Sequence, residues 1–424
     1  MKRLLCIIIC IIMVLMLVGC NKEKGGRSEH SLLSDYEKSE SIPEYDFVSG
    51  EYTMPENFEG YSKGAMDFAF SLLSAASEDG ENSVISPLSV SNVLALILNG
   101  ADTATEKEIR QTIAGVDTDT INLCNHYINS RLNTFSGEEG GFTIADSLWL
   151  DDSFDVKAAF LQNAVNYYNS EVMRIDLQDK ETLSEINDWI KDYTDDEISD
   201  VINNIDENAL MMLVNAVFMQ DEWATVYEEE QLDKGVFHGS KGDTEATFMN
   251  SMEHYISSSY AQGFIKGFKN LPLKFVALLP EGDVSAEEFV ENFTSARWQE
   301  LLASQQATAF CSAFLPEFKI DFDAELSDAL KDMGINRAFD NSKADFSQLS
   351  NMSKPFVSEV NHKAFIEIGP MGAKVGAATV SEMKGSAALS DVKEVKLNKP
   401  FVFVICDNES GIPVLTGVVN NVSK

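Results

Sequence analysis

The residue types that carry out catalysis are present in this chain, but they form no complete catalytic motif. The 424 residues contain no HExxH, GxGxxG or Walker sequence, and the five histidines share no metal-ligand spacing. The one GxSxG spacing, at Gly60–Gly64, follows a polar segment and not a strand, so it is no nucleophile elbow. Ser86 precedes Pro87 and an apolar helical pattern, so we expect it to cap a helix rather than to act as a nucleophile. No pair among the 68 acidic residues is marked out by its position. The sequence therefore predicts no enzyme, no metal site and no cofactor.

One weakly polar stretch, Gly369–Val380 with the sequence GPMGAKVGAATV, has an alternation that suits a strand. One face of such a strand would be small or apolar and uncharged, and would carry Ala373, Val375, Ala377 and Thr379. The other face would carry Lys374, Gly376, Ala378 and Val380. This pattern is typical of a strand that can enter a sheet over a packed core. On the pattern alone, a flexible surface connector fits the stretch equally well.

Helical and β patterns fill one continuous region without a linker that would divide it. Helical apolar spacing occurs in Ala65–Ala76, Pro87–Leu98, Ala158–Tyr168, Thr182–Tyr193 and Ala324–Met333. Short β-rich runs, several of them apolar throughout, are FTIADSLWL, ALMMLVNAVFM, LKFVALLP and HKAFIEI. The chain ends in a predicted hairpin with its turn at Asn408–Gly411. We expect one mixed α and β domain with large central sheets.

The N-terminus has the order of a secretory signal. A basic MKR precedes the apolar segment Leu4–Val18, which is too short to span a bilayer, and small residues follow. The sequence LVGC, ending at Cys20, resembles the lipobox of bacterial lipoproteins, in which the cysteine is lipidated; an ordinary signal with an incidental cysteine is the alternative. We expect residues 1–19 to be removed, 20–58 to form a disordered tether and 59–424 to fold. The exported chain would then be held at the bacterial surface, facing outward, by its lipid alone.

Charge and cysteine content exclude further classes of function. The formal net charge of −36 makes nucleic acid a poor partner, because contacts to phosphate dominate its binding. Beyond the N-terminal segment, the cysteines are Cys124, Cys311 and Cys406, with no CxxC pattern. We expect these three residues to be buried as small hydrophobic side chains rather than to form a disulfide framework.

Six blocks of the chain, in their order, resemble the serpin family over almost all of Gly60–Val422. The first, NSVISPLSVSNVLALILNGADTATEKEI, contains Asn82, Ser86 and Ser89 of the family's early signature. The others are LVNAVFMQDEW, FLPEFKIDFDAELSDALKDMGINRAFD, ADFSQLS, EVNHKAFIEI and LNKPFVFVICDNESGIPVLTGVV. One block would be weak evidence, whereas six in the right order identify the chain as a member of this family of serine protease inhibitors.

The resemblance implies an α+β serpin fold with three β-sheets, about nine helices and an exposed reactive-centre loop. In that family a serine protease cleaves the loop and is acylated by it, and the hinge of the loop then inserts into the main sheet as a new strand. The movement distorts the protease and traps the acyl-enzyme. By the same resemblance, a polar cluster beneath the sheet would control its opening and would contain Asn82, Ser86, Ser89 and His362. Asn215 and Trp223 would lie on the strand beside which insertion begins.

The hinge resembles that of inhibitory serpins, with three departures. It matches the family at Gly372, Ala373, Gly376, Ala377, Ala378 and Thr379. Pro370 and Lys374 stand where inhibitory members usually have an acid, and Val375 is larger than the usual alanine. On insertion Lys374 should point outward and Val375 inward, where its size could slow the movement. Pro370 lacks an N–H group, but it lies at the edge of the hinge.

The usual interval from the hinge glycine places the scissile bond at Ser386–Ala387, which favours elastase-like or subtilisin-like proteases. A shifted register would place it at Met383–Lys384, for chymotrypsin-like or elastase-like enzymes, or at Lys384–Gly385, for trypsin-like ones. We predict a lipid-anchored monomer that inhibits serine proteases as a suicide substrate. The alternative is a non-inhibitory serpin-fold surface binding protein, which the hinge departures keep open. A lipoprotein hydrolase is a third class and lacks a supporting motif.

Overall fold

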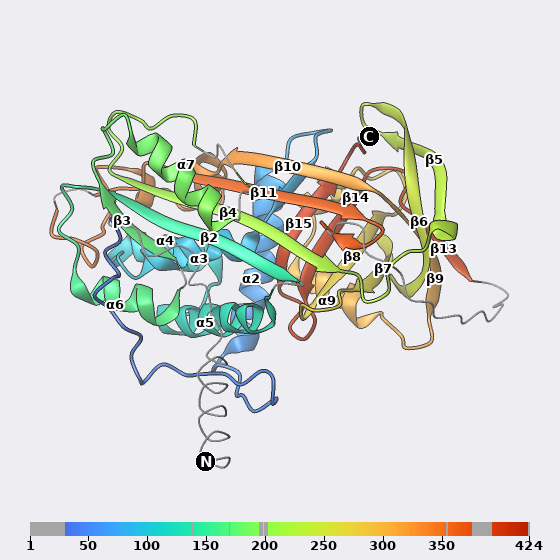
Figure 1. The fold of residues 1–424 in the computed structure, drawn as a ribbon, viewed down its shortest axis with the longest axis horizontal. Helices are drawn as coiled ribbons and strands as arrows, with labels where there is room; N and C mark the ends of the chain where they lie inside the picture. The colour runs from blue at the N-terminus through green and yellow to red at the C-terminus, as the bar shows by residue number, and fades with distance from the viewer. Residues whose placement is uncertain are drawn as a thin grey trace, which may run out of the picture.

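The computed structural model describes residues 30–137, 140–168, 170–194, 198, 202–352, 355–374 and 392–422. Their helices and strands form an α+β fold in which two hydrogen-bonded sheets are covered by helices (Figure 1). The expected fold class is thereby confirmed. The three described cysteines are free and buried, as predicted.

A six-stranded sheet, which we call the central sheet, contains most of the residues singled out by the sequence. Its order is β10 (Phe318–Glu325), β11 (Glu359–Gly369), β12 (Gly372–Ala373), β4 (Met211–Glu222), β2 (Gly141–Asp151) and β3 (Glu171–Ile175). Strand β4 is buried along nearly its whole length, because its run MMLVNAVFM is covered on both faces. Strands β11 and β4 are parallel, and β2 is antiparallel to β4.

The second hydrogen-bonded sheet has nine strands. Its path is β1 (Ser83–Ile85), β15 (Pro413–Val419), β14 (Phe401–Asp407), β8 (Leu273–Pro280), β7 (Ala261–Gly267), β6 (Gly242–Ser257), β9 (Phe310–Pro316) and β13 (Lys393–Lys396), with β5 (Leu232–Gly239) paired to β6. The long strand β6 pairs with β5 and β9 over most of its length and with β7 only through its last four residues, 254–257. The expected three sheets are therefore present as the central sheet and two parts that share β6.

Nine α-helices lie within the described residues, in agreement with the expected number. They are α2 (Phe58–Ala76), α3 (Pro87–Leu98), α4 (Thr103–Ile113), α5 (Thr118–Phe135), α6 (Ala158–Tyr167), α7 (Thr182–Tyr193), α8 (Ala286–Glu291), α9 (Ser295–Ala303) and α10 (Ser327–Asp332). Helix α7 lies on one face of the central sheet and α3 on the other (Figure 1). Within the described ranges, no helix is both long and apolar enough to cross a membrane.

The segment 30–57, predicted to be part of a disordered tether, packs on the domain instead. Its backbone joins the edge strand β3, because the Leu32 N–H donates to Val172 O (2.8 Å) and the Arg174 N–H donates to His30 O (3.0 Å). Leu33, Ile42 and Phe47 are buried. The composition of this segment is polar, but these three apolar side chains pack against the domain, whereas Val48 and Met54 remain exposed. The folded unit of the described chain therefore begins at residue 30 rather than at 59.

Candidate functional site: the hinge and the central sheet

The hinge begins as the second strand of a tight hairpin. Strand β11 ends at Gly369, Pro370 and Met371 form the turn, and Gly372 pairs back to Gly369. A proline at the first central position of a turn has its φ already set, and the missing N–H costs no ladder hydrogen bond there. The turn therefore accommodates the departure at Pro370. The Pro370 carbonyl oxygen accepts from the Tyr227 N–H at 3.0 Å.

The two residues of β12 lie between β11 and β4. Gly372 pairs with Glu222 and Ala373 with Asp221 on β4, while Ala373 also pairs with Ile368 on β11. Beyond β12 the two long strands pair directly with each other, from Glu359–Phe365 to Met212–Phe218. The start of the hinge thus forms a wedge at the end of a closed parallel ladder.

Glycine is required at the first position of the wedge. Gly372 has φ +153°, and a Cβ placed there would lie 2.0 Å from the carbonyl oxygen of Asp221. Any side chain would therefore force the β12 backbone away from β4. This close approach gives a physical reason for the glycine that the sequence placed at the start of the hinge.

The described hinge side chains alternate as the sequence predicts. Ala373 is fully buried in the larger apolar core beneath the sheet. The Lys374 ammonium lies on the opposite face, 4.8 Å from the ring centroid of Phe218 and 5.0 Å from that of Phe365. Those two rings belong to the last registered pair of the β4–β11 ladder. A cation over them adds attraction at the point where the two strands begin to part.

Trp223 binds the hairpin through two hydrogen bonds. Its backbone N–H donates to Met371 O (2.8 Å) and its indole N–H donates to Gly369 O (2.9 Å). The ring is 1% exposed and stacks on Phe268 with centroids 4.8 Å apart. The tryptophan therefore binds both ends of the turn to the second sheet.

A buried ion pair lies beside this tryptophan. The Lys266 ammonium is 2.6 Å from Glu253 and lies over the rings of Tyr227 (4.3 Å) and Trp223 (5.5 Å). Burial lowers the pKa of Lys266, and the Glu253 carboxylate opposes that shift. The ion pair therefore packs against two rings whose residues, Trp223 and Tyr227, donate hydrogen bonds to the turn of the hinge.

Further along the ladder, a row of three polar residues crosses the central sheet. Asp146 on β2 is opposite Asn215 on β4, and Asn215 is opposite His362 on β11. All three are buried, and their side chains are joined by hydrogen bonds from Asn215 to Asp146 and between His362 and Asn215. The row spans the β4–β11 interface that direct pairing keeps closed.

Helix α3 supplies two serines to the row. Ser86 caps the helix, as predicted, by accepting from the Ser89 N–H at 3.3 Å, and its hydroxyl donates to Val414 O at 2.8 Å. Its own N–H donates to Nε2 of His362 at 3.3 Å. The Ser89 hydroxyl donates to Asp146 Oδ1 at 2.6 Å and accepts from the Asn215 amide. The structure therefore brings together Ser86, Ser89, Asn215 and His362.

Burial shifts both titratable members of the row toward their neutral forms. It raises the pKa of Asp146 to about 7, although hydrogen bonds from Ser89, Asn215 and Asn92 oppose the shift. It lowers the pKa of His362 to about 3. Sequence reasoning missed Asp146; the available signal was a single carboxylate inside the otherwise uncharged run FTIADSLWL.

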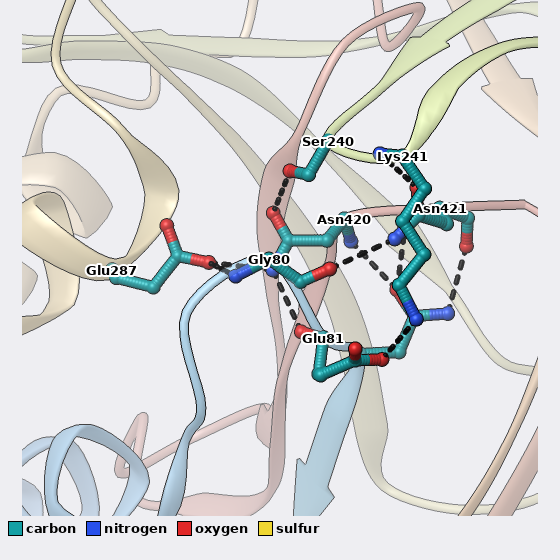
Figure 2. A network of polar contacts seen from close by, with 8 residues as sticks. Gly80, Glu81, Ser240, Lys241, Glu287, Asn420 and Asn421 are labelled. Carbon is teal, nitrogen blue, oxygen red and sulfur yellow. Dashed lines mark hydrogen bonds and ion pairs between the residues drawn. The ribbon is translucent and has the colours of Figure 1, made fainter.

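Asn82 lies elsewhere, and its predicted place in this cluster is wrong. Its side-chain oxygen accepts from the backbone N–H groups of Asn420 (2.7 Å) and Asn421 (2.8 Å). Figure 2 shows the network that surrounds those two residues, in which the Asn420 amide also donates to Glu287 at 2.6 Å. The asparagine therefore ties β1 to the segment after β15, and it is not in contact with the central row.

The remaining predicted site residues lie outside the described residues, and so does the N-terminal signal. They are Cys20, Val375, Gly376, Ala377, Ala378, Thr379, Met383, Lys384, Ser386 and Ala387. Among the described residues, no three His, Cys, Asp or Glu side chains converge to hold a metal ion.

Comparison with known proteins identifies relatives over most of the chain. A family model described as serpin (serine protease inhibitor) matches residues 63–422. An uncharacterized serpin-like protein from Methanosarcina mazei is 28% identical, with 99% of this chain and 98% of that protein covered. Human alpha-1-antichymotrypsin is 28% identical, with 83% and 85% covered.

Two solved structures of the thermophilic serpin tengpin share 31% identity with the chain. The native state gives a TM-score of 0.83 and covers 92% of this chain and 99% of that one. The latent state gives a TM-score of 0.73 and covers 88% of this chain and 100% of that one. The fold described above resembles the native state more strongly.

Proposed function

Because this chain belongs to the serpin family, we propose that it inhibits serine proteases as a suicide substrate. The protease serine attacks the carbonyl carbon of the scissile bond, the amine leaves with a proton, and an ester joins loop and enzyme. The hinge then inserts between β4 and β11 and carries the protease with it before water can hydrolyse the ester. The main support is β12, because Gly372 and Ala373 already occupy the sheet position that insertion must extend.

The register of β12 determines which neighbours the next hinge residue would meet. Continued without a shift between β4 and β11, it brings Val375 between Met219 and Ile366 on the inner face. Both neighbours are fully buried in the apolar core. An apolar side chain is suited to that environment, so the larger valine need not prevent insertion, although it adds volume to a packed region.

The same register leads to the polar row. Thr379 would arrive between Asn215 and His362, where its hydroxyl could replace the hydrogen bond that joins them. Gly376 would pass between Phe218 and Phe365 on the outer face, and it has no side chain to clash with the two rings. A loop with these residue types at these positions is well matched to the strand pair that must admit it.

The energy available from insertion is sufficient for trapping. The direct β4–β11 ladder covers seven registered pairs, and insertion replaces it with two antiparallel interfaces. Each added backbone hydrogen bond contributes about 0.5–1.5 kcal/mol, so a strand of roughly a dozen residues gives about 10 kcal/mol before entropy costs. Slowing deacylation tenfold requires only about 1.4 kcal/mol.

The partner class follows from the scissile bond. With cleavage at Ser386–Ala387, the small residue before the bond favours elastase-like or subtilisin-like proteases. Cleavage after Lys384 would favour trypsin-like enzymes, and cleavage after Met383 chymotrypsin-like or elastase-like ones.

A direct test is to incubate the purified protein with elastase, subtilisin and trypsin and to examine the products on denaturing gels. The protein should keep residues 30–58, since they pack on the domain. We expect a covalent complex of summed mass, with a released fragment whose N-terminus locates the cleaved bond. Loop cleavage that leaves every protease active would contradict inhibition.

The melting temperature of the loop-cleaved protein separates the two remaining possibilities. If the hinge inserts after cleavage, the added strand should raise the melting temperature sharply. An unchanged melting curve together with active proteases would favour the alternative, a non-inhibitory surface binding protein.

We also propose that the chain is exported and anchored by a lipid on Cys20, as a monomer. The first described residue of the packed segment, His30, follows that cysteine by ten residues, so the domain would be held within about 35 Å of its lipid. Metabolic labelling with a radioactive fatty acid should label the wild-type chain and leave Cys20→Ser unlabelled. Equal labelling of both would contradict the assignment.

A further inference from the structure

Asp146 is a buried carboxyl group without a positively charged partner. The residue is 3% exposed, and its Oδ1 accepts from the Ser89 hydroxyl at 2.6 Å and from the Asn215 amide. The groups that face it from α3, α5 and β4 are neutral: Ser89, Asn92, Asn129 and Asn215. Among the described residues of its network, His362 on β11 is the other titratable group. Burying a carboxylate under these conditions is costly, whereas burying the neutral acid is not.

The hydrogen bonds of the row have one consistent direction. The Ser86 N–H donates to Nε2 of His362, which assigns the imidazole proton to Nδ1. That Nδ1–H donates to Oδ1 of Asn215, and the Asn215 Nδ2–H donates to Asp146. The chain of bonds therefore crosses from β11 to β4 to β2 and ends on the carboxyl group. Separation of β11 from β4 must break the hydrogen bond between His362 and Asn215.

A small polar cavity lies next to the carboxyl group. It has a volume of about 40 Å³ and lies between β2 and α5, where Asp146, Asn92, Asn129, Asn133 and Ser170 contribute to its lining. A polar cavity of this size can hold a water molecule. Such a water is the natural carrier of a proton to or from the buried oxygen.

We propose that Asp146 holds a proton while the central sheet is closed and releases it when β4 and β11 separate. Breaking the link between His362 and Asn215 admits water or a hydroxyl group to the row, and either would stabilise the ionised carboxylate. Closed sheet and bound proton are therefore linked, and rising pH favours opening. The pKa of Asp146, raised to about 7 by burial in the closed sheet, places this linkage near neutrality. Its effect on protease trapping rests on the proposed function, but its effect on opening does not.

Amide hydrogen exchange of the full chain, followed by mass spectrometry between pH 5.5 and 8.5, tests the proposal without a protease. Peptides from β4 and β11 report the opening constant once the intrinsic exchange rate is divided out. Opening also frees His362, whose pKa is lowered to about 3 in the closed sheet and which therefore favours opening as the pH falls. The readout is accordingly the opening constant of the wild type divided by that of Asp146→Asn, a variant that retains His362. Because Asp146→Asn keeps the size and a hydrogen-bond acceptor, this ratio isolates the carboxyl group, and it should rise with pH up to about 7, by about tenfold for each pKa unit that opening relieves.

Asp323→Asn is the matched control. It removes one carboxylate from β10 of the same sheet, where Asp323 is 3.9 Å from Lys363 and does not contact the row. The opening constant of this variant, divided by that of Asp146→Asn, should rise with pH as the wild-type ratio does. Ser89→Ala removes one donor to the carboxylate and should move the rise to higher pH, which provides a second test if Asp146→Asn does not fold.

A ratio of the wild-type to the Asp146→Asn opening constant that is flat or falls with pH overturns the proposal. These outcomes do not depend on whether any protease is trapped. A failure to form covalent complexes would therefore count against the proposed function and leave the pH linkage standing.

Discussion

A charge placed on the inner face of the hinge should convert an inhibitor into a substrate. Ala373 is fully buried between β4 and β11, and its side chain faces the apolar core. In Ala373→Glu the carboxylate would keep residue 373 out of that core in the uncleaved protein, and insertion would then have to bring it in unpaired, at a cost of several kcal/mol. A penalty of about 3 kcal/mol in the insertion step slows insertion about 100-fold, while deacylation of the protease is unaffected. The acyl-enzyme should then hydrolyse before it is trapped.

The matched control is Lys374→Glu, one residue further along the chain. It introduces the same side chain on the outer face, where the change removes contacts with the rings of Phe218 and Phe365. Such contacts are worth about 0.5–1 kcal/mol at exposed sites, so trapping should change little.

The assay is the stoichiometry of inhibition against elastase and subtilisin, with complexes counted on denaturing gels. We expect the wild type and Lys374→Glu to form covalent complexes and Ala373→Glu to be cleaved without trapping. Melting curves of the uncleaved proteins verify that each variant is folded. An unchanged stoichiometry in a folded Ala373→Glu protein would refute the assignment of the inner face.

Three further predictions concern stability. Leu33→Ala should lower the free energy of unfolding by about 2–5 kcal/mol because a buried leucine is truncated. If thermal melts showed no difference between this variant and the exposed control Ser34→Ala, the result would support a disordered tether instead. Asp146 has its pKa raised from 3.8 to about 7, so its contribution to stability is full below about pH 4 and is lost as the pH rises to about 7. In urea unfolding, the stability of Asp146→Asn relative to the wild type should therefore increase between these pH values, and the difference should stay constant above them. A difference in the free energy of unfolding that is the same at every pH would contradict this. Lys266→Met leaves Glu253 without its ion-pair partner and should cost about 3–5 kcal/mol in urea, and the added change Glu253→Gln should recover part of that loss.

Local patterns in the sequence determined most of the elements. The apolar spacing of Thr182–Tyr193 predicted α7 with the bounds that the structure has, because one face of that helix covers the central sheet. Ser86 was identified as a helix cap from its position before Pro87, since capping depends on neighbouring residues alone. The alternation of Ala373 and Lys374 likewise predicted their opposite faces, because strand geometry fixes it.

Tertiary structure decided what depends on residues far apart in the chain. Polar composition predicted disorder before residue 58, but three buried side chains and pairing with β3 hold the described part of that segment on the domain. Asn82 was assigned to the central cluster by the family resemblance, whereas its partners are residues 420 and 421 at the other end of the chain. Asp146 became a site only because the strand registers bring it beside Asn215 and, through Asn215, to His362. Register and long-range pairing are set by the packing of the whole chain, and no local pattern encodes them.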